Sequence, residues 1–266
     1  MDIDLLVVSV GNTRTAFGAF VEGMLTTVRR ADNRDGAGME AALSAAWEAL
    51  AQRPSPDVAG VCVREDLRDR VAAAVRQRSG RAVRWVRHAV PEGVADPQAL
   101  EPPFPVLTEH PDRTGLDRVL ATAAAYEQLG RACCVVDAGT AVTVNFCSDK
   151  GEFLGGAIAP GVRAQLRAMR DAAPALPETA LVRPGGAVGR STEDAMCHGV
   201  YHGIRGLVRE VVENYATQLG RWPEVIATGG DAELLFGDWE LVHAVAPDLL
   251  LYGVALAYVQ AMEKAA

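Results

Sequence analysis

The chain of 266 residues has few cysteines, few aromatic residues and no long apolar run. Its five cysteines form no CxxC pair and show no metal-ligand spacing, which argues against a disulfide framework and favours a reducing, cytoplasmic location. No uncharged apolar stretch approaches the ~18 residues that a membrane span needs, and the first residues lack the basic segment of a signal peptide. The net charge of −8 argues against a general electrostatic grip on nucleic acid or on an anionic membrane.

Two related stretches stand near the start and the middle of the chain. "VVSVGNTRTAFGAF" (7–20) and "VVDAGTAVTVNF" (135–146) each read as a strand, a turn through Gly and Thr, and a second strand. In both halves, strands are followed by segments of helical periodicity, which predicts an α/β protein built from two similar halves. We place these halves at residues 1–114 and 115–266.

Periodicity predicts the other elements in more detail. We expect helices over residues 38–50, 65–78, 116–130, 162–169, 191–219 and 248–265. We expect further strands over residues 57–63, 81–86, 152–160 and 224–228. The proline-rich stretch 91–115 shows no periodicity and predicts a long loop, a kind of segment that is often functional.

The two hairpin turns carry groups suited to phosphate. A Gly-Thr turn presents backbone N–H groups and a hydroxyl at one end of a sheet, which can form an anion-binding concavity. A carboxylate just before the turn, such as Asp137, can hold the cation that travels with a nucleotide. One such turn is also an ordinary hairpin turn. Two copies together with the late "TGG" (228–230) predict an ATP cleft, with a phosphate turn on each wall and an adenosine shelf at "TGG".

Five motifs that follow the opening hairpin sharpen this hypothesis. They are "HPDRTGLDR" (110–118), "VVDAGTAVT" (135–143), "GEFLGGAIAPG" (151–161), "GRSTEDAMCHGVYHG" (189–203) and "VIATGGDAELL" (225–235). This set resembles the type III pantothenate kinase family, within the acetate kinase, sugar kinase, heat-shock and actin superfamily, and covers nearly the whole chain. The resemblance implies two similar actin/ribonuclease H-like halves, each a mixed sheet with flanking helices, around an ATP cleft. It also implies ATP-dependent phosphorylation of pantothenate to 4'-phosphopantothenate, the first step of coenzyme A biosynthesis.

The resemblance further implies roles for single positions. Asp117 would be the general base on the hydroxyl that attacks the γ-phosphate, and Asp137 would hold a monovalent cation, K⁺ or NH₄⁺. ATP, entering with Mg²⁺ or another divalent cation, would contact Ser9, Val10, Gly11, Asn12, Thr13, Arg14, Thr15, Ala16 and Thr140. Pantothenate would contact Thr108, Gly115, Leu116, Asp117, Arg118 and Thr192. The family also implies a homodimer through a long helix, with Thr192 closing the site of either subunit.

Several of these positions have a structural explanation as well. An aspartate within reach of an alcohol can accept its proton, but "DR" at a helix start, as at Asp117 and Arg118, is more often a surface ion pair. Asp137 in an apolar strand would be costly without a cation or several hydrogen bonds. Thr192 lies in "STED", which is also an ordinary helix cap. His198 and His202 have metal-ligand spacing without an apparent third ligand.

Three residues depart from the family pattern. Ser9 stands where the family carries an aspartate that positions Mg²⁺, so one negative charge is missing. Asp4 is five residues upstream, about 16 Å away along an extended strand and on its opposite face, so it does not replace that charge. Asn145 stands where the second strand commonly has an aspartate, and Thr108 stands where the substrate loop often has an aromatic residue.

These departures leave three functions open. The first is a pantothenate kinase with a weakened metal site, which the survival of Asp117 and Asp137 favours. The second is a catalytically impaired paralogue that binds nucleotide or pantothenate, or acts as a regulator or dimeric scaffold. The third is a kinase for another small hydroxy acid, since Thr108 would open the substrate pocket.

Overall fold

The structure is a computed structural model that describes residues 3–88 and 99–265. The described residues form two compact units. The first comprises residues 3–88, 99–104, 109–124 and 250–265, and the second comprises residues 105–108 and 125–249. The C-terminal segment therefore packs with the N-terminal elements rather than with the rest of the predicted half 115–266.

The first unit contains a mixed sheet of five strands. Its strands are β1 (Leu5–Val10), β2 (Arg14–Val21), β3 (Met24–Asp32), β4 (Asp57–Cys62) and β5 (Arg84–Trp85). Their order is β3-β2-β1-β4-β5, with β1, β2 and β3 joined as antiparallel hairpins and β4 and β5 added in parallel. The predicted hairpin at 7–20 is confirmed, whereas the strand expected over 81–86 is reduced to the two residues of β5.

The second unit repeats this arrangement. Its strands are β6 (Cys133–Ala138), β7 (Ala141–Cys147), β8 (Phe153–Pro160), β9 (Glu224–Thr228) and β10 (Ala244–Val245). Their order, β8-β7-β6-β9-β10, matches that of the first sheet strand by strand, with the same antiparallel and parallel pairings. The prediction of two similar halves with mixed sheets is confirmed.

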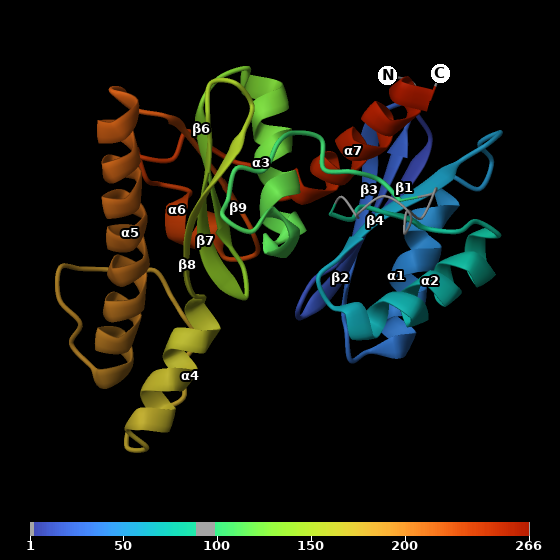
Figure 1. Cartoon of the computed structure of the whole chain (residues 1–266). Coiled ribbons are helices and arrows are strands. Elements are labelled where there is room, and N and C mark those ends of the chain that lie inside the picture. Colours follow the sequence, from blue (N-terminus) through green and yellow to red (C-terminus); the bar gives the residue numbers. More distant parts are fainter. Residues whose placement is uncertain (1–2, 89–98, 266) are drawn as a thin grey trace. The chain divides into compact units, whose positions relative to one another are not determined.

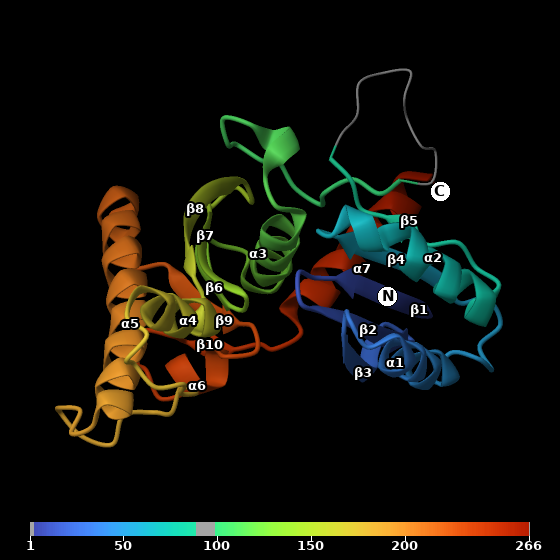
Figure 2. The same cartoon turned by 90° about the horizontal axis from the view of Figure 1, so that it is seen from below.

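Helices cover both faces of the first sheet, because side chains of β1 alternate between the faces. The helices are α1 (Gly36–Glu48), α2 (Glu65–Ser79), the N-terminal part of α3 (Leu116–Leu129) and α7 (Leu249–Ala265). Leu6 and Val8 pack with the apolar residues of α1 and α2. Leu5, Val7 and Leu120 form a second cluster with residues of α7. Figure 2 shows α1 and α2 beside the strands of this sheet.

One long helix dominates the second unit (Figure 1). In addition to part of α3, this unit contains three helices: α4 (Val162–Ala172), α5 (Thr192–Leu219) and α6 (Ala232–Phe236). The side chain of Ser191 caps α5 by accepting a hydrogen bond from Asp194 N at 3.1 Å, and Gly220 ends it with φ of 75°. The predicted helix over 191–219 is therefore confirmed. Throughout the described ranges, the helices are too short or too polar to cross a bilayer.

Candidate functional site

The turn of the first hairpin is held closed by a residue from the next strand connection. Asn33 Nδ2 donates to the carbonyl of Gly11 at 2.8 Å, and its Oδ1 accepts from Thr15 Oγ1 at 2.8 Å. The Asn33 backbone N–H donates to the Thr13 carbonyl at 3.0 Å, and Gly11 N donates to the Arg14 carbonyl at 3.0 Å. Thr15 is fully buried and Asn33 nearly so. This network gives the predicted phosphate turn one fixed shape.

Sequence analysis missed Asn33. A signal was present in "DNRD" (32–35), a turn-forming run at the end of β3. The antiparallel pairing of Arg14 with Asp32 brings that run next to the first turn. Pairing between strands is a tertiary property, so the sequence pattern alone marked a turn there and did not show what the turn would contact.

Ser9 lies at the end of β1 and its side chain is mostly buried, with 7% exposed. By alternation along β1 it shares the face of Leu5 and Val7, the face on which α3 and α7 pack. Asp4 is not available to it. The Asp4 carboxylate accepts hydrogen bonds from Arg53 Nε at 2.8 Å and from a backbone N–H, and the Arg53 hydrogen bond lowers the Asp4 pKa. Asp4 therefore does not supply the negative charge that is missing at Ser9.

Asp117 lies in the first turn of α3, where the positive end of the helix dipole favours a carboxylate. Burial raises the pKa of Asp117, against the opposing effects of a hydrogen bond from the Arg118 backbone N–H and of the Arg118 charge. Burial likewise lowers the pKa of Arg118. The two groups are thus partly desolvated together, unlike a surface ion pair. A carboxylate whose pKa is raised in this way is suited to accept a proton.

Gly115 is fitted closely to this carboxylate. A Cβ placed on Gly115 would lie 2.7 Å from Asp117 Oδ1, so any larger residue would displace the carboxylate or the turn. The carbonyl of Gly115 accepts the first hydrogen bonds of α3, from Arg118 N at 3.1 Å and Val119 N at 3.3 Å. The "GLDR" motif therefore brings Gly115, Asp117 and Arg118 together, as predicted.

The predicted substrate residues are divided between the two units. Gly115 to Arg118 belong to the first unit, whereas Thr108 and Thr192 belong to the second. Thr108 lies beside β8, its methyl carbon 3.6 Å from the position of a Cβ on Gly155. Thr192 is an exposed first residue of α5. Of the predicted loop 91–115, residues 91–98 lie outside the described residues.

Asp137 lies at the end of β6 between two threonines. It pairs in register with Thr143 of β7 and with Thr228 of β9, so the three side chains share one face. A carboxylate and two hydroxyls are the hard oxygen donors that suit K⁺ or NH₄⁺. Asp137 is partly exposed, so the expectation that it is buried in an apolar strand is wrong. Its position at the end of the strand keeps it within reach of water.

Three glycine turns meet around this aspartate. Gly229 of the "TGG" turn has φ of 98°, and a Cβ there would lie 2.4 Å from Asp137 Oδ1. Gly161, directly before α4, lies against the hairpin turn, where a Cβ would be 2.4 Å from the Gly139 carbonyl oxygen and 2.6 Å from that of Thr140. The structure therefore brings the second hairpin turn and the "TGG" turn together, which the sequence motifs predicted as neighbours in a nucleotide site.

The structure explains why residue 145 is asparagine rather than the family's aspartate. It is fully buried, and its Nδ2 donates to Thr143 Oγ1 at 2.9 Å and to the Val135 carbonyl at 3.3 Å. An ionised aspartate has no donor and would face the Val135 carbonyl oxygen without a hydrogen bond. This departure from the family pattern therefore ties β7 to β6.

A divalent cation would find few anionic ligands here. The described residues contain no group of three or more His, Cys, Asp or Glu side chains placed to hold a metal ion. His198 and His202 lie with ring centroids 5.4 Å apart, and Asp194 Oδ1 is 3.7 Å from His198 Nε2. Among the predicted site residues, Asp137 shares its strand face with two hydroxyl side chains, those of Thr143 and Thr228.

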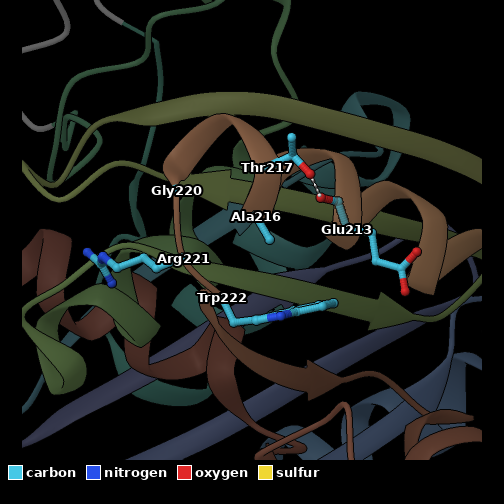
Figure 3. Close-up of a pocket in the computed structure, with 6 residues that line it drawn as sticks. All are labelled: Glu213, Ala216, Thr217, Gly220, Arg221 and Trp222. Atoms are coloured by element: carbon cyan, nitrogen blue, oxygen red, sulfur yellow. Dashed lines mark hydrogen bonds between the residues drawn. The ribbon is translucent and has the colours of Figure 1, made fainter.

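A hollow of about 560 Å³ lies at the C-terminal end of α5 (Figure 3). It is lined by Glu213, Ala216, Thr217, Gly220, Arg221 and Trp222. Thr217 Oγ1 donates to the Glu213 carbonyl at 2.9 Å. None of the predicted site residues lines it. This hollow therefore does not coincide with the predicted site residues, which are Asp117 and the residues of the glycine turns.

Solved structures share the fold. A conserved Campylobacter jejuni protein assigned to the Baf family of transcriptional activators has a TM-score of 0.60 at 20% identity, covering 97% of this chain and 99% of that one. Component A of (R)-2-hydroxyglutaryl-CoA dehydratase from Acidaminococcus fermentans has a TM-score of 0.55 at 14% identity, covering 99% of each chain. At these identities the likeness concerns the fold alone. The two matching mixed sheets with their flanking helices define the class: an actin/ribonuclease H-like fold.

Sequence comparison identifies the family. The family model for type III pantothenate kinase matches residues 5–214. A protein of that name from Parafrankia sp. (strain EAN1pec) is 33% identical over 254 residues, covering 96% of this chain and 97% of that one. Another from Dehalococcoides mccartyi (strain ATCC BAA-2266 / KCTC 15142 / 195) is 39% identical over 153 residues, and there the chain spans 59% of the relative's length. The chain belongs to the type III pantothenate kinase family, as the motifs indicated.

Proposed function

We propose that this protein transfers the γ-phosphoryl group of ATP to the primary hydroxyl of pantothenate, forming 4'-phosphopantothenate and ADP. This reaction would be the first step towards coenzyme A, carried out in the cytoplasm by a homodimer. The observation that carries the proposal is the partly desolvated Asp117, whose pKa is raised and whose carboxylate lies against Gly115 in the family's own motif. Membership of the family supports the choice of substrates.

The chain's own residues would divide the work. Asp117 would accept the proton of the attacking hydroxyl, the hydroxyl oxygen would form the new bond to phosphorus, and ADP would leave. Arg118, always charged, would hold the substrate carboxylate or keep Asp117 in place. The stretch 9–16, whose turn is ordered by Asn33, and Thr140 would hold the ATP phosphates.

Cations would add positive charge near the phosphates. Asp137, with Thr143 and Thr228, would hold the monovalent cation. The hydroxyl of Ser9 would face the divalent cation that accompanies ATP, as a neutral ligand in place of a carboxylate. We therefore expect a higher requirement for Mg²⁺ or Mn²⁺ than an aspartate at this position would give.

The test is ADP release and phosphopantothenate formation by the purified protein, across a Mg²⁺ and a Mn²⁺ series with K⁺ or NH₄⁺ present. We expect turnover that falls about 10²–10⁴-fold in Asp117→Asn, because that is the usual contribution of a general base. Glu109→Gln, which changes an exposed acid of the preceding loop, is the matched control and should leave the rate unchanged.

Other outcomes would replace the proposal. If no condition gives turnover while calorimetry shows tight binding of ATP or pantothenate, the protein is a binding or regulatory relative. If a panel of small hydroxy acids contains a substrate with higher kcat/KM than pantothenate, the acceptor assignment is wrong while the kinase assignment stands. Thr108, which stands in place of the family's aromatic residue, is the reason to include such a panel.

A further inference from the structure

Two arginines at the start of α2 reach the first hairpin turn. Arg64, the residue directly before α2, donates from Nη1 to the carbonyl of Asn12 at 3.2 Å. Arg70, in the second turn of α2, donates from Nη2 to the carbonyl of Asn33 at 2.8 Å. Asn12 belongs to the predicted phosphate turn, and Asn33 holds that turn closed. Both bonds join residues that are distant in the chain, 52 and 37 positions apart.

Strand pairing brings the start of α2 to this turn. β4 runs parallel to β1 with Cys62 in register with Val10, and the N–H of Val63 donates to the Val10 carbonyl at 3.0 Å. The turn begins at Gly11, so the chain that leaves β4 passes beside it before α2 starts. The carboxyl ends of parallel strands lie at one edge of a sheet, which is where ligands bind in α/β folds.

The guanidinium of Arg64 is held in a fixed orientation by Asp66. Arg64 Nε donates to Asp66 Oδ1 at 2.7 Å and Nη2 donates to Oδ2 at 2.6 Å, a bidentate pair that also fixes the plane of the group. The remaining nitrogen, Nη1, makes the bond to the Asn12 carbonyl. Because the peptide that follows Asn12 is planar, holding this carbonyl also holds the N–H of Thr13, within the stretch that would contact the ATP phosphates.

Arg70 acts on the turn through Asn33. The backbone N–H, Nδ2 and Oδ1 of Asn33 bond to the stretch that contains Gly11, Thr13 and Thr15. The Asn33 carbonyl is its fourth hydrogen-bonding group, and this is the atom that Arg70 contacts. Asn33 is 7% exposed, so its backbone has little room to move once all four groups are bonded. The bond from Arg70 therefore fixes the residue whose side chain closes the turn.

We propose that Arg64 and Arg70 are positioning residues for ATP, bracing the first phosphate turn through the backbone carbonyls of Asn12 and Asn33. The proposal rests on the proposed function, in which this turn holds the nucleotide phosphates. A misplacement of about 1 Å can cost on the order of 10²-fold in rate, and we expect less for bonds that are open to water. The effect should fall on ATP, because the predicted pantothenate contacts lie on other segments of the chain.

The first test removes the donors and keeps the aliphatic stems. We expect Arg64→Met and Arg70→Met each to lower kcat/KM for ATP about tenfold, with KM for pantothenate within about twofold of the native value. Arg70→Lys should restore most of the loss, because a single donor reaches the Asn33 carbonyl. Arg64→Lys should restore only part, since an ammonium lacks the fork that pairs with Asp66 while bonding to the turn.

Arg68→Met is the matched control. Arg68 lies on the same helix, and its side chain bonds to Glu65 and Asp69 of that helix. We expect its removal to leave the kinetics with ATP unchanged. If Arg64→Met and Arg70→Met match this control in kcat/KM for ATP, the two arginines are only structural and the proposal is overturned, whatever the melting temperatures of the variants.

A second readout does not require turnover. Calorimetry with Mg²⁺ and the non-hydrolysable ATP analogue AMP-PNP measures binding to the native protein and to the three Met variants. If the native protein shows no turnover but Arg64→Met and Arg70→Met weaken analogue binding and Arg68→Met does not, the proposed function fails and the positioning role stands. If the native protein turns over and all three variants bind as it does, the positioning role alone is overturned. A native protein that neither turns over nor binds the analogue overturns both.

Discussion

Replacing Ser9 by aspartate restores the negative charge that the family carries at this position and that this chain lacks. The side chain is 7% exposed at the end of β1, so the new carboxylate would be largely removed from water. Without a partner, such a group costs several kcal/mol, reduced in practice by protonation or local rearrangement. We therefore expect Ser9→Asp without nucleotide to be destabilised by about 1–3 kcal/mol, or roughly 2–12 °C in melting temperature for a chain of this size.

When Mg-ATP is bound, we expect the new carboxylate to be favourable rather than costly. A carboxylate about 4 Å from a dication interacts by about 8 kcal/mol at an effective dielectric constant of about 20, and water and phosphate oxygens share that attraction. If only a fifth of it reaches the transition state, the gain is about 1.6 kcal/mol, or more than tenfold in rate. We expect kcat/KM for Mg-ATP to rise at least tenfold in Ser9→Asp and the Mg²⁺ requirement to fall.

The assay pairs thermal unfolding with steady-state ADP release across a Mg²⁺ series. Ser9→Asn is the matched control, because it has the size of the aspartate without its charge. Equal kinetics and equal stability in the two variants would refute the reasoning, since the effect would then be one of volume. Loss of stability in Ser9→Asp that Mg-ATP does not recover would show that no cation approaches Ser9.

Three further predictions concern the turns and the base. Asn33→Ala removes two hydrogen bonds of the first turn and leaves the fully buried Thr15 hydroxyl without its acceptor, so we expect a loss of about 2–4 kcal/mol in chemical denaturation; Asn33→Asp, which keeps that acceptor, should lose less. Gly229→Ala should destabilise by about 2 kcal/mol or more and weaken ATP binding, because φ is 98° and the Cβ meets Asp137; Gly230→Ala, with open space around its Cβ, should do neither. The acid limb of the kcat/KM profile should lie above pH 3.8, because the pKa of Asp117 is raised and the base is ionised only above it; a limb at or below that pH would contradict its role. Because burial raises the pKa of Asp117, this acid stabilises the folded state relative to the unfolded state most at low pH, where it is protonated. That contribution to stability is lost as the pH rises through the raised pKa. Asp117→Asn should remove this pH dependence of the free energy of unfolding.

Much of the fold was predictable because its signals are local. Hairpin turns, helical periodicity and the Ser191 cap are properties of neighbouring residues, and each predicted the element that the structure contains. Short elements were predicted less well. The two-residue strands β5 and β10 and the short helix α6 have no periodicity of their own, because their neighbours in the sheet or core define them.

The site shows the same division. The sequence by itself determined the chemical groups: the carboxylates of Asp117 and Asp137, the glycines of the turns, and the hydroxyl of Ser9 in place of the family's carboxylate. Only the tertiary structure decided what surrounds them. Asn33 reaches the first turn through strand pairing, and burial raises the pKa of Asp117. The contacts of Asn33 join residues that are distant in the chain, and both these contacts and the burial of Asp117 depend on how strands and helices pack, which no short stretch of sequence specifies.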